Sequence, residues 1–114
     1  MSRFRNLSPD AADDLDAMIG WMLDRGASAA LAERVLAAVL DAADRLAERP
    51  LLGRRRPDLL PEPFRFWSIP RHRLLLVYDP SVRPATVLRV LSTDQDLLPL
   101  LAGLRDLAGP EGPF

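Results

Sequence analysis

The side chains best suited to chemistry in this chain are arginines, which gather in its middle third. Residues 49–73 carry seven arginines against two acidic residues, although the whole chain has a formal net charge of −1. The densest part is the run Gly53-Arg54-Arg55-Arg56-Pro57-Asp58-Leu59. Arginine stays charged, and its planar guanidinium pairs with carboxylates or phosphates through two hydrogen bonds. The pattern predicts a basic face that attracts acidic partners or polyanions; the plain alternative is a solvated loop that binds nothing.

The composition of the chain limits the functions in which these arginines can take part. The chain has 114 residues, of which 48% are hydrophobic and 27% charged, as is typical of one globular domain. We expect this domain over residues 1–108, followed by a flexible tail over 109–114. Cysteine is absent and there is one histidine, so disulfides and thiolate sites are excluded, and no metal or other cofactor is expected. No apolar run approaches the roughly 20 residues that span a bilayer. We therefore expect a cytoplasmic protein without membrane contact.

The first half of the sequence predicts two antiparallel helices. The segment Ser8-Pro9-Asp10 suits a helix start, because serine caps, proline fits the first turn and aspartate complements the helix dipole. Gly26 suits a left-handed helix end. Ser28 can cap a second helix that runs to about Arg49. Before both helices, residues 3–7 are interpreted as a short edge strand.

The second half predicts three strands. Residues 64–69 alternate aromatic and polar side chains, residues 74–78 are continuously apolar, and residues 86–91 are rich in β-branched types. Their short connections favour an antiparallel meander, and residues 97–104 suit a short C-terminal helix. The predicted fold class is α+β: an N-terminal edge strand, a helical hairpin, then a three-stranded antiparallel meander that completes one small sheet, with a short C-terminal helix. We expect helices on one sheet face and a partly open second face.

Several segments resemble the RelE/ParE superfamily, the toxins of bacterial type II toxin–antitoxin pairs. They are, in chain order, Leu7-Ser8-Pro9, residues 53–59, Arg65, Arg73, Val77-Tyr78, residues 87–91 and Asp96-Leu97. The pattern Gly-Arg-x-Arg-Pro-Asp-Leu at 53–59 is similar to the ParE branch in particular. The resemblance implies the order of elements derived above. It also implies a cognate antitoxin that wraps and neutralises the toxin and assembles it into an oligomer.

The superfamily implies two different chemistries. RelE-like members cut messenger RNA on the ribosome without a metal, which requires proton transfer and cations that stabilise the charged phosphorane. In this chain such a site would use Arg65, Arg73, His72 and Tyr78, with Arg71 beside them. Against it, a lone histidine in a tight turn is more often a solvated residue, and a tyrosine that ends an apolar strand is more often core. Leu75 also stands where the nuclease branch often has arginine.

The leading hypothesis is therefore a ParE-like toxin without catalytic residues. The resemblance implies that such toxins inhibit DNA gyrase by binding, with plasmid stabilisation or growth arrest as the outcome. The residues predicted to contact the antitoxin or the target are Arg54, Arg55, Arg56, Arg65, Trp67, Arg71, Arg73 and Arg89. Trp67 is included because an exposed aromatic side chain on an open sheet face suits an antitoxin groove. The alternative is that both sheet faces are covered.

Two further functions stay open. The first is a ribosome-dependent endoribonuclease of the RelE type, and the second is a non-toxic relic that only binds antitoxin. Direct sequence-specific binding of nucleic acid is not expected, because the isoelectric point is about 5.8 and none of the predicted helices is basic.

Overall fold

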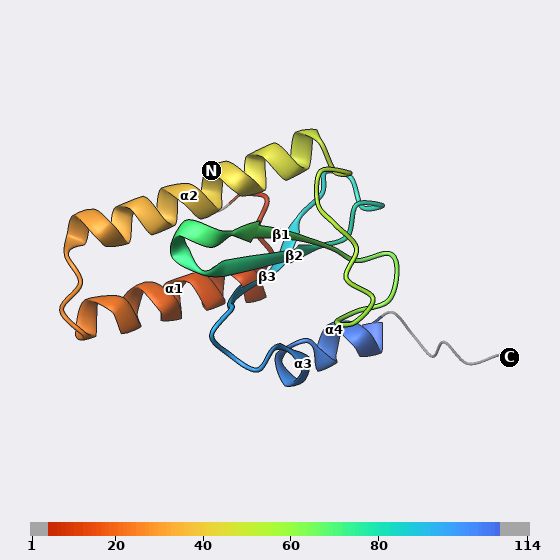
Figure 1. Cartoon of the computed structure of the whole chain (residues 1–114). Coiled ribbons are helices and arrows are strands. Elements are labelled where there is room, and N and C mark those ends of the chain that lie inside the picture. The colour runs from red at the N-terminus through yellow and green to blue at the C-terminus, as the bar shows by residue number, and fades with distance from the viewer. Residues whose placement is uncertain (1–4, 108–114) are drawn as a thin grey trace, which may run out of the picture.

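The fold places two long helices against a small antiparallel sheet (Figure 1). A computed structural model describes residues 5–107. The elements are α1 (Pro9–Asp24), α2 (Ala29–Glu48), β1 (Arg65–Ile69), the 3-10 turn η1 (Pro70–His72), β2 (Leu74–Tyr78), β3 (Val87–Ser92), α3 (Leu97–Leu100) and α4 (Ala102–Leu107). The predicted α+β class with an antiparallel meander is confirmed. The domain boundary at 108 stays a prediction, and the tail expected over 109–114 lies outside the described residues.

The helical hairpin is set by its caps. The Ser8 hydroxyl accepts a hydrogen bond from the amide of Ala11 at 3.0 Å, and the Ser28 hydroxyl accepts one from the amide of Leu31 at 3.1 Å. Gly26 follows α1 with a φ of 92°, an angle that glycine adopts without a steric penalty. These local signals end α1 and start α2, and therefore fix the turn between the two helices.

The sheet is covered on both faces. Strand β2 lies between β1 and β3, and all of its residues are buried. Leu74, Leu76 and Tyr78 pack with buried residues of α1 and α2. Leu75 and Val77 point to the opposite face, where residues of the loop before β1 and of the C-terminal segment form a second cluster. The expected open face is therefore wrong, because apolar side chains of both segments cover it.

The two ends of the described chain also depart from expectation. Residues 3 and 4 of the expected edge strand lie outside the described residues, and Leu7 makes one parallel bridge to Val87. Asn6 has a φ of 71°, which interrupts an extended backbone and so keeps residues 5–7 from forming a strand. The expected C-terminal helix is divided at Leu101 into α3 and α4.

One ion pair connects α1 to β3. The Asp14 carboxylate accepts hydrogen bonds from Arg89 Nε at 2.6 Å and from the second Arg89 terminal nitrogen at 2.9 Å. It also accepts the backbone N–H of Val90 at 3.0 Å. The first terminal nitrogen of Arg89 donates to the carbonyl of Leu100 at 2.8 Å, so the same guanidinium connects β3 to α3. The side chains of Arg89 and Asp14 are only 24% and 18% exposed, so water screens the pair weakly.

Replacing Asp14 with alanine should therefore lower the free energy of unfolding by about 2 kcal/mol, since hydrogen bonds to charged groups contribute about 1.5–3 kcal/mol. Urea denaturation measures the change. Asp13→Ala is the matched control, because Asp13 lies on the same helix and is exposed; its effect should stay within about 0.5 kcal/mol. Equal effects of the two substitutions would show that the ion pair does not stabilise the fold.

Candidate functional site

Most arginines of the middle third lie in two segments, one before and one after β1, and these segments lie at opposite ends of that strand (Figure 1). One group lies in residues 50–63, called here the arginine loop, which leads into the first residue of β1. The other lies at Arg71 and Arg73, in the turn that follows the last residue of β1. A five-residue strand is about 17 Å long. The single basic face expected from the sequence is therefore two surfaces, divided by the length of β1.

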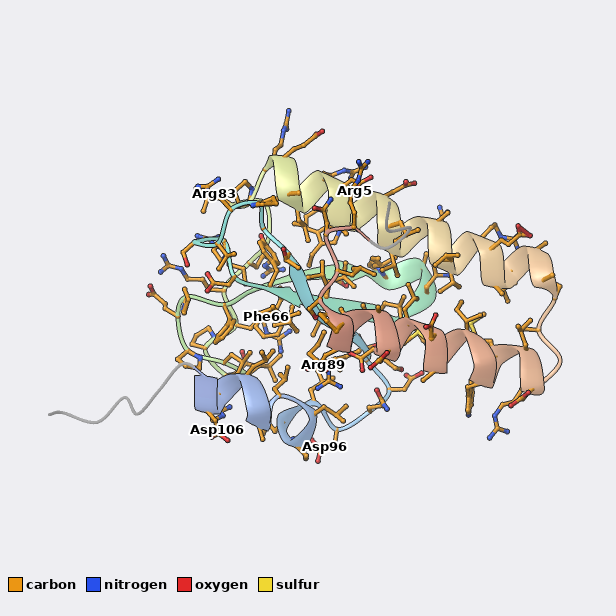
Figure 2. All side chains as sticks on the ribbon, turned by 180° about the vertical axis from the view of Figure 1, so that it is seen from behind. Arg5, Phe66, Arg83, Arg89, Asp96 and Asp106 are labelled. Carbon is orange, nitrogen blue, oxygen red and sulfur yellow. The ribbon has the colours of Figure 1, made fainter. Side chains whose placement is uncertain are left out.

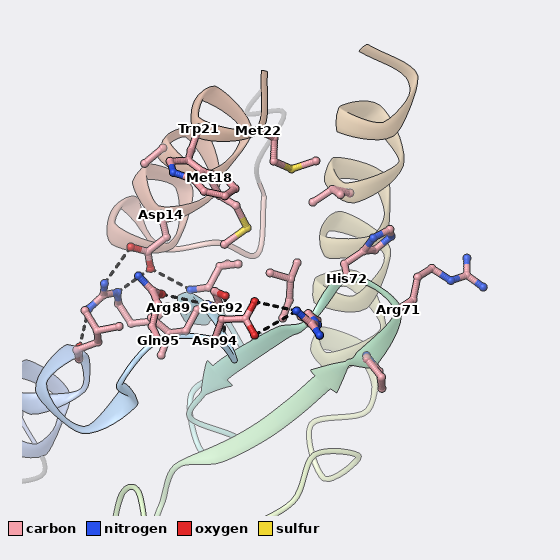
Figure 3. Close-up of a pocket in the computed structure, with 18 of the residues that line it drawn as sticks. Asp14, Met18, Trp21, Met22, Arg71, His72, Arg89, Ser92, Asp94 and Gln95 are labelled. Atoms are coloured by element: carbon pink, nitrogen blue, oxygen red, sulfur yellow. Dashed lines mark hydrogen bonds and ion pairs between the residues drawn. The ribbon is translucent and has the colours of Figure 1, made fainter. Parts of the chain in front are cut away.

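A groove lies between the helical hairpin and the turn after β1 (Figure 3), with a volume of about 900 Å³. We call it the helix–turn groove. Its apolar wall comes mainly from α1 and α2, and its polar edge comes from the turn and from the end of β3. The apolar residues include Met18, Trp21, Met22, Leu31 and Val35, and the polar ones include Asp14, Arg71, His72, Arg73, Arg89 and Asp94. The Trp21 side chain is 58% exposed, so part of this apolar surface faces water.

The arginines that line the groove differ in whether they form ion pairs with other residues of the chain. Arg73 donates to both oxygens of Asp94 at 3.3 and 3.4 Å, and Arg89 is held by Asp14 as described above. Among residues 5–107, Arg71 has no ion-pair partner, and its side chain points away from Arg89 and Asp94 (Figure 3). Arg71 is therefore the groove cation best placed to meet a carboxylate of another molecule.

The arginine loop carries its charges on exposed side chains. Arg55 pairs with Glu62 at 3.0 Å and Arg56 pairs with Asp58 at 2.8 Å. The hydrogen bond between Arg56 and Asp58 lowers the pKa of the Asp58 carboxyl and raises the pKa of Arg56. Exposed pairs of this kind contribute little to stability, because water screens them and two long side chains must be held in place. They can open at little cost, so these arginines remain available to a partner.

The backbone of the loop is held from inside by two side chains. The Tyr78 hydroxyl, fully buried, donates to the Pro50 carbonyl at 2.6 Å and accepts the Gly53 N–H at 2.7 Å. Arg65 donates to the Gly53 carbonyl at 2.8 Å. A Cβ at Gly53 would lie 2.5 Å from the Tyr78 hydroxyl oxygen and 2.8 Å from the backbone oxygen of Phe66. Glycine is required here because no side chain fits between the loop and the sheet.

The residues considered for RNA cleavage do not form one site in residues 5–107. Arg71, His72 and Arg73 line the helix–turn groove, whereas Arg65 and Tyr78 do not line it. The hydroxyl of Tyr78 is buried with both hydrogen bonds made, which leaves it no route to a substrate.

Trp67, chosen as a partner contact, packs partly buried against the helix-side core. Phe64 and Phe66 are buried on the opposite face (Phe66 is labelled in Figure 2). The alternation of aromatic residues along β1 is therefore confirmed, but the phenylalanines are covered rather than exposed. Trp67 contributes to the interior of the helical layer.

Sequence reasoning missed the roles of Asp14 and Gly53. The role of Asp14 has no local signal in the sequence, because its partner Arg89 lies 75 residues away along the chain. Gly53 belongs to the Gly-Arg-x-Arg-Pro-Asp-Leu pattern, but no neighbouring residue indicates that its backbone lies against Tyr78, 25 residues further along the chain. Contacts across such sequence distances leave no local pattern that a single sequence displays.

The described residues form a helical hairpin on a small antiparallel sheet, with arginine-bearing segments before and after β1. Residues 6–97 match the family model described as "ParE toxin of type II toxin-antitoxin system, parDE". This match spans well over half of the chain, so the chain belongs to the ParE toxin family and the resemblance noted in the sequence is confirmed. Searches of curated proteins and of solved structures found no match.

Within residues 5–107, no helix is long and apolar enough to cross a membrane. In the same part of the chain, no three histidine, aspartate or glutamate side chains are grouped so that they could hold a metal ion.

Tyr78 gives a prediction about stability and pH. Tyr78→Phe leaves the Gly53 N–H and the Pro50 carbonyl without a partner, which should lower the free energy of unfolding by about 1–3 kcal/mol at neutral pH. Burial raises the pKa of the Tyr78 hydroxyl, against smaller lowering effects of the Gly53 N–H and the Arg65 charge. Because the folded pKa lies above the unfolded value of about 10, this stabilisation is complete below that pH and is lost as pH rises through the folded pKa.

Urea denaturation at neutral pH and above pH ~10 measures both effects. Tyr78 is the one tyrosine of the chain, so tyrosinate absorbance follows its titration directly. The wild-type chain should lose stability in the alkaline range, and Tyr78→Phe should lose less. Identical alkaline losses in both proteins would contradict the assignment.

Proposed function

We propose that this ParE-family chain is a toxin that arrests growth by binding DNA gyrase, and that a cognate antitoxin holds it inactive. Family membership supports the toxin and the antitoxin partner. Binding rather than cleavage is supported by one observation in particular: the buried, doubly bonded hydroxyl of Tyr78 lies outside the groove that Arg71, His72 and Arg73 line. Gyrase acts on DNA in the cytoplasm, which would also be the location of this chain.

The antitoxin fits the helix–turn groove best. The groove offers an apolar wall to an amphipathic segment, and Arg71 at its edge offers a charge to a carboxylate. Peptides commonly bind in this way, with apolar anchors in a groove and polar contacts at the rim. Arg71 and Arg73 are proposed as direct contacts. Arg65, Arg89 and Trp67 are proposed to support the two surfaces from within, because their side chains are engaged inside the chain.

One observation supports the alternative that the chain is a ribonuclease. Arg71, His72 and Arg73 lie together at one groove, and two cations beside a histidine could stabilise a phosphorane and move a proton. Cleaved transcripts in phase with codons after induction would favour this function over gyrase binding. A chain that causes no growth arrest would favour an antitoxin-binding relic.

The proposed function predicts that the purified chain inhibits gyrase-catalysed supercoiling and that the antitoxin reverses the inhibition. A supercoiling assay with and without antitoxin measures both effects, and a gyrase-independent DNA relaxation assay serves as the control. No inhibition at an excess of toxin over gyrase would exclude gyrase as the target.

Replacing Arg54, Arg55 and Arg56 together with alanine should weaken binding to antitoxin or target by at least about tenfold, which is about 1.4 kcal/mol. The fold should persist, because the ion pairs of Arg55 and Arg56 are exposed and Arg54 pairs with Phe66 through its backbone alone. Isothermal titration and growth curves measure the loss, and circular dichroism checks the fold. Unchanged affinity together with unchanged growth arrest would remove the arginine loop from the interface.

A further inference from the structure

A second, smaller hollow lies at the end of the sheet opposite to the helix–turn groove. It has a volume of about 440 Å³ and is lined by Arg49, Pro50, Leu51, Leu52 and Arg83. Arg49 to Leu52 follow α2, and Arg83 belongs to the connection between β2 and β3. Figure 2 shows Arg83 beside the C-terminal end of α2, away from the tip of the helical hairpin. We call this site the loop hollow.

Apolar side chains are exposed at and beside the loop hollow. Leu51 is 67% exposed, and Val82, next to Arg83 in the chain, is 51% exposed. They are two of the five large hydrophobic side chains that are exposed in residues 5–107. Burying such side chains against a partner removes apolar surface from water and is favourable, so the hollow offers anchor positions for an apolar group.

The charged residues that line the hollow have one sign. Both charged residues that line the hollow are arginines, and neither Arg49 nor Arg83 makes an ion pair within residues 5–107. The carboxylate of Asp79, in the same connection as Arg83, is already bonded to Ser81. The two guanidinium groups are therefore available, and the chemistry that complements them is a carboxylate or a phosphate.

The floor of the hollow is preformed. Tyr78 holds the Pro50 carbonyl from inside, and Arg65 donates to the carbonyls of Leu51 and Gly53 at 3.5 and 2.8 Å. A loop that is already ordered before binding loses little conformational entropy when a partner docks. Tyr78 and Arg65 thus fix the backbone of the hollow, although their own side chains do not line it.

We propose that the loop hollow docks an acidic protein segment of the toxin's target, with an apolar side chain of that segment seated against Leu51. This proposal rests on the proposed function, in that it assumes a target. Protein is favoured over nucleic acid because a phosphate backbone offers nothing to the exposed Leu51 and Val82. The target is favoured over the antitoxin because the larger apolar groove suited to an antitoxin segment lies at the other end of β1.

The test compares single substitutions in the full chain. Arg49→Glu, Arg83→Glu and Leu51→Asn change the hollow. Arg34→Glu and Leu98→Asn are the matched controls, since Arg34 is exposed on α2 and Leu98 is 49% exposed on α3. The readouts are growth arrest on induced expression at equal protein level, supercoiling by purified gyrase, and affinity for the purified antitoxin. Circular dichroism confirms that each variant is folded.

We expect each hollow variant to need about tenfold more protein for the same growth arrest and gyrase inhibition, in line with loss of one interface anchor. Antitoxin affinity should change by less than about twofold, and the controls should match the wild type. Lost antitoxin affinity with growth arrest retained would overturn the proposal in favour of the antitoxin as occupant. If Arg49→Glu and Arg83→Glu lose growth arrest while Leu51→Asn behaves as wild type, the proposal is overturned in favour of a phosphate-bearing partner.

The proposal and the proposed function fail in different ways. If the wild-type chain arrests growth without affecting gyrase, gyrase is wrong as the target, and the growth readout still decides on the hollow. If gyrase is inhibited equally by wild type and hollow variants, the hollow is wrong and the proposed function stands. If the wild-type chain arrests no growth, both are overturned.

Discussion

The burial of strand β2 on both faces is the constraint on which the rest of the structure depends. Its residues alternate between two apolar clusters, one under the long helices and one under the C-terminal segment and the loop before β1. A strand of this kind requires cover on each side, because leaving either face open would expose several leucine and valine side chains to water. The helical hairpin cannot supply both layers. The short helices α3 and α4 and Leu59 and Leu60 supply the second one.

Polar side chains at the margins of these clusters fix the remaining segments. Asp14 and Arg89 tie α1 to β3 and to α3, and the Tyr78 hydroxyl ties β2 to the arginine loop. All side-chain polar atoms that are buried in the described residues have a hydrogen-bond partner. Since an unpaired buried polar group is costly, each of these contacts selects one arrangement of its segments over others. The positions of the surface arginines follow from these internal contacts.

Features of the fold that depend on neighbouring residues could be predicted from the sequence. The caps at Ser8 and Ser28, the turn at Gly26 and the central strand all carry local signals, and the structure confirms them. The sequence also carries a signal for the covered second face, because Leu97, Leu101 and Leu104 follow the spacing of one helix face. The ion pair of Asp14 and Arg89 and the contact of Tyr78 with Gly53 had none, since they join residues 75 and 25 positions apart.

The candidate site was harder to predict than the fold, for a geometric reason. A count of arginines along the chain cannot reveal that β1 runs between Arg54 and Arg71 and carries them to opposite ends of the sheet.

The separation of these two surfaces has a consequence for how an antitoxin neutralises the toxin. An antitoxin segment confined to the helix–turn groove would leave the arginine loop and the loop hollow uncovered. About five further extended residues would bridge the length of β1 at roughly 3.3 Å each. An antitoxin that wraps the toxin along this path could cover both surfaces, whereas a shorter one would have to act on the groove alone.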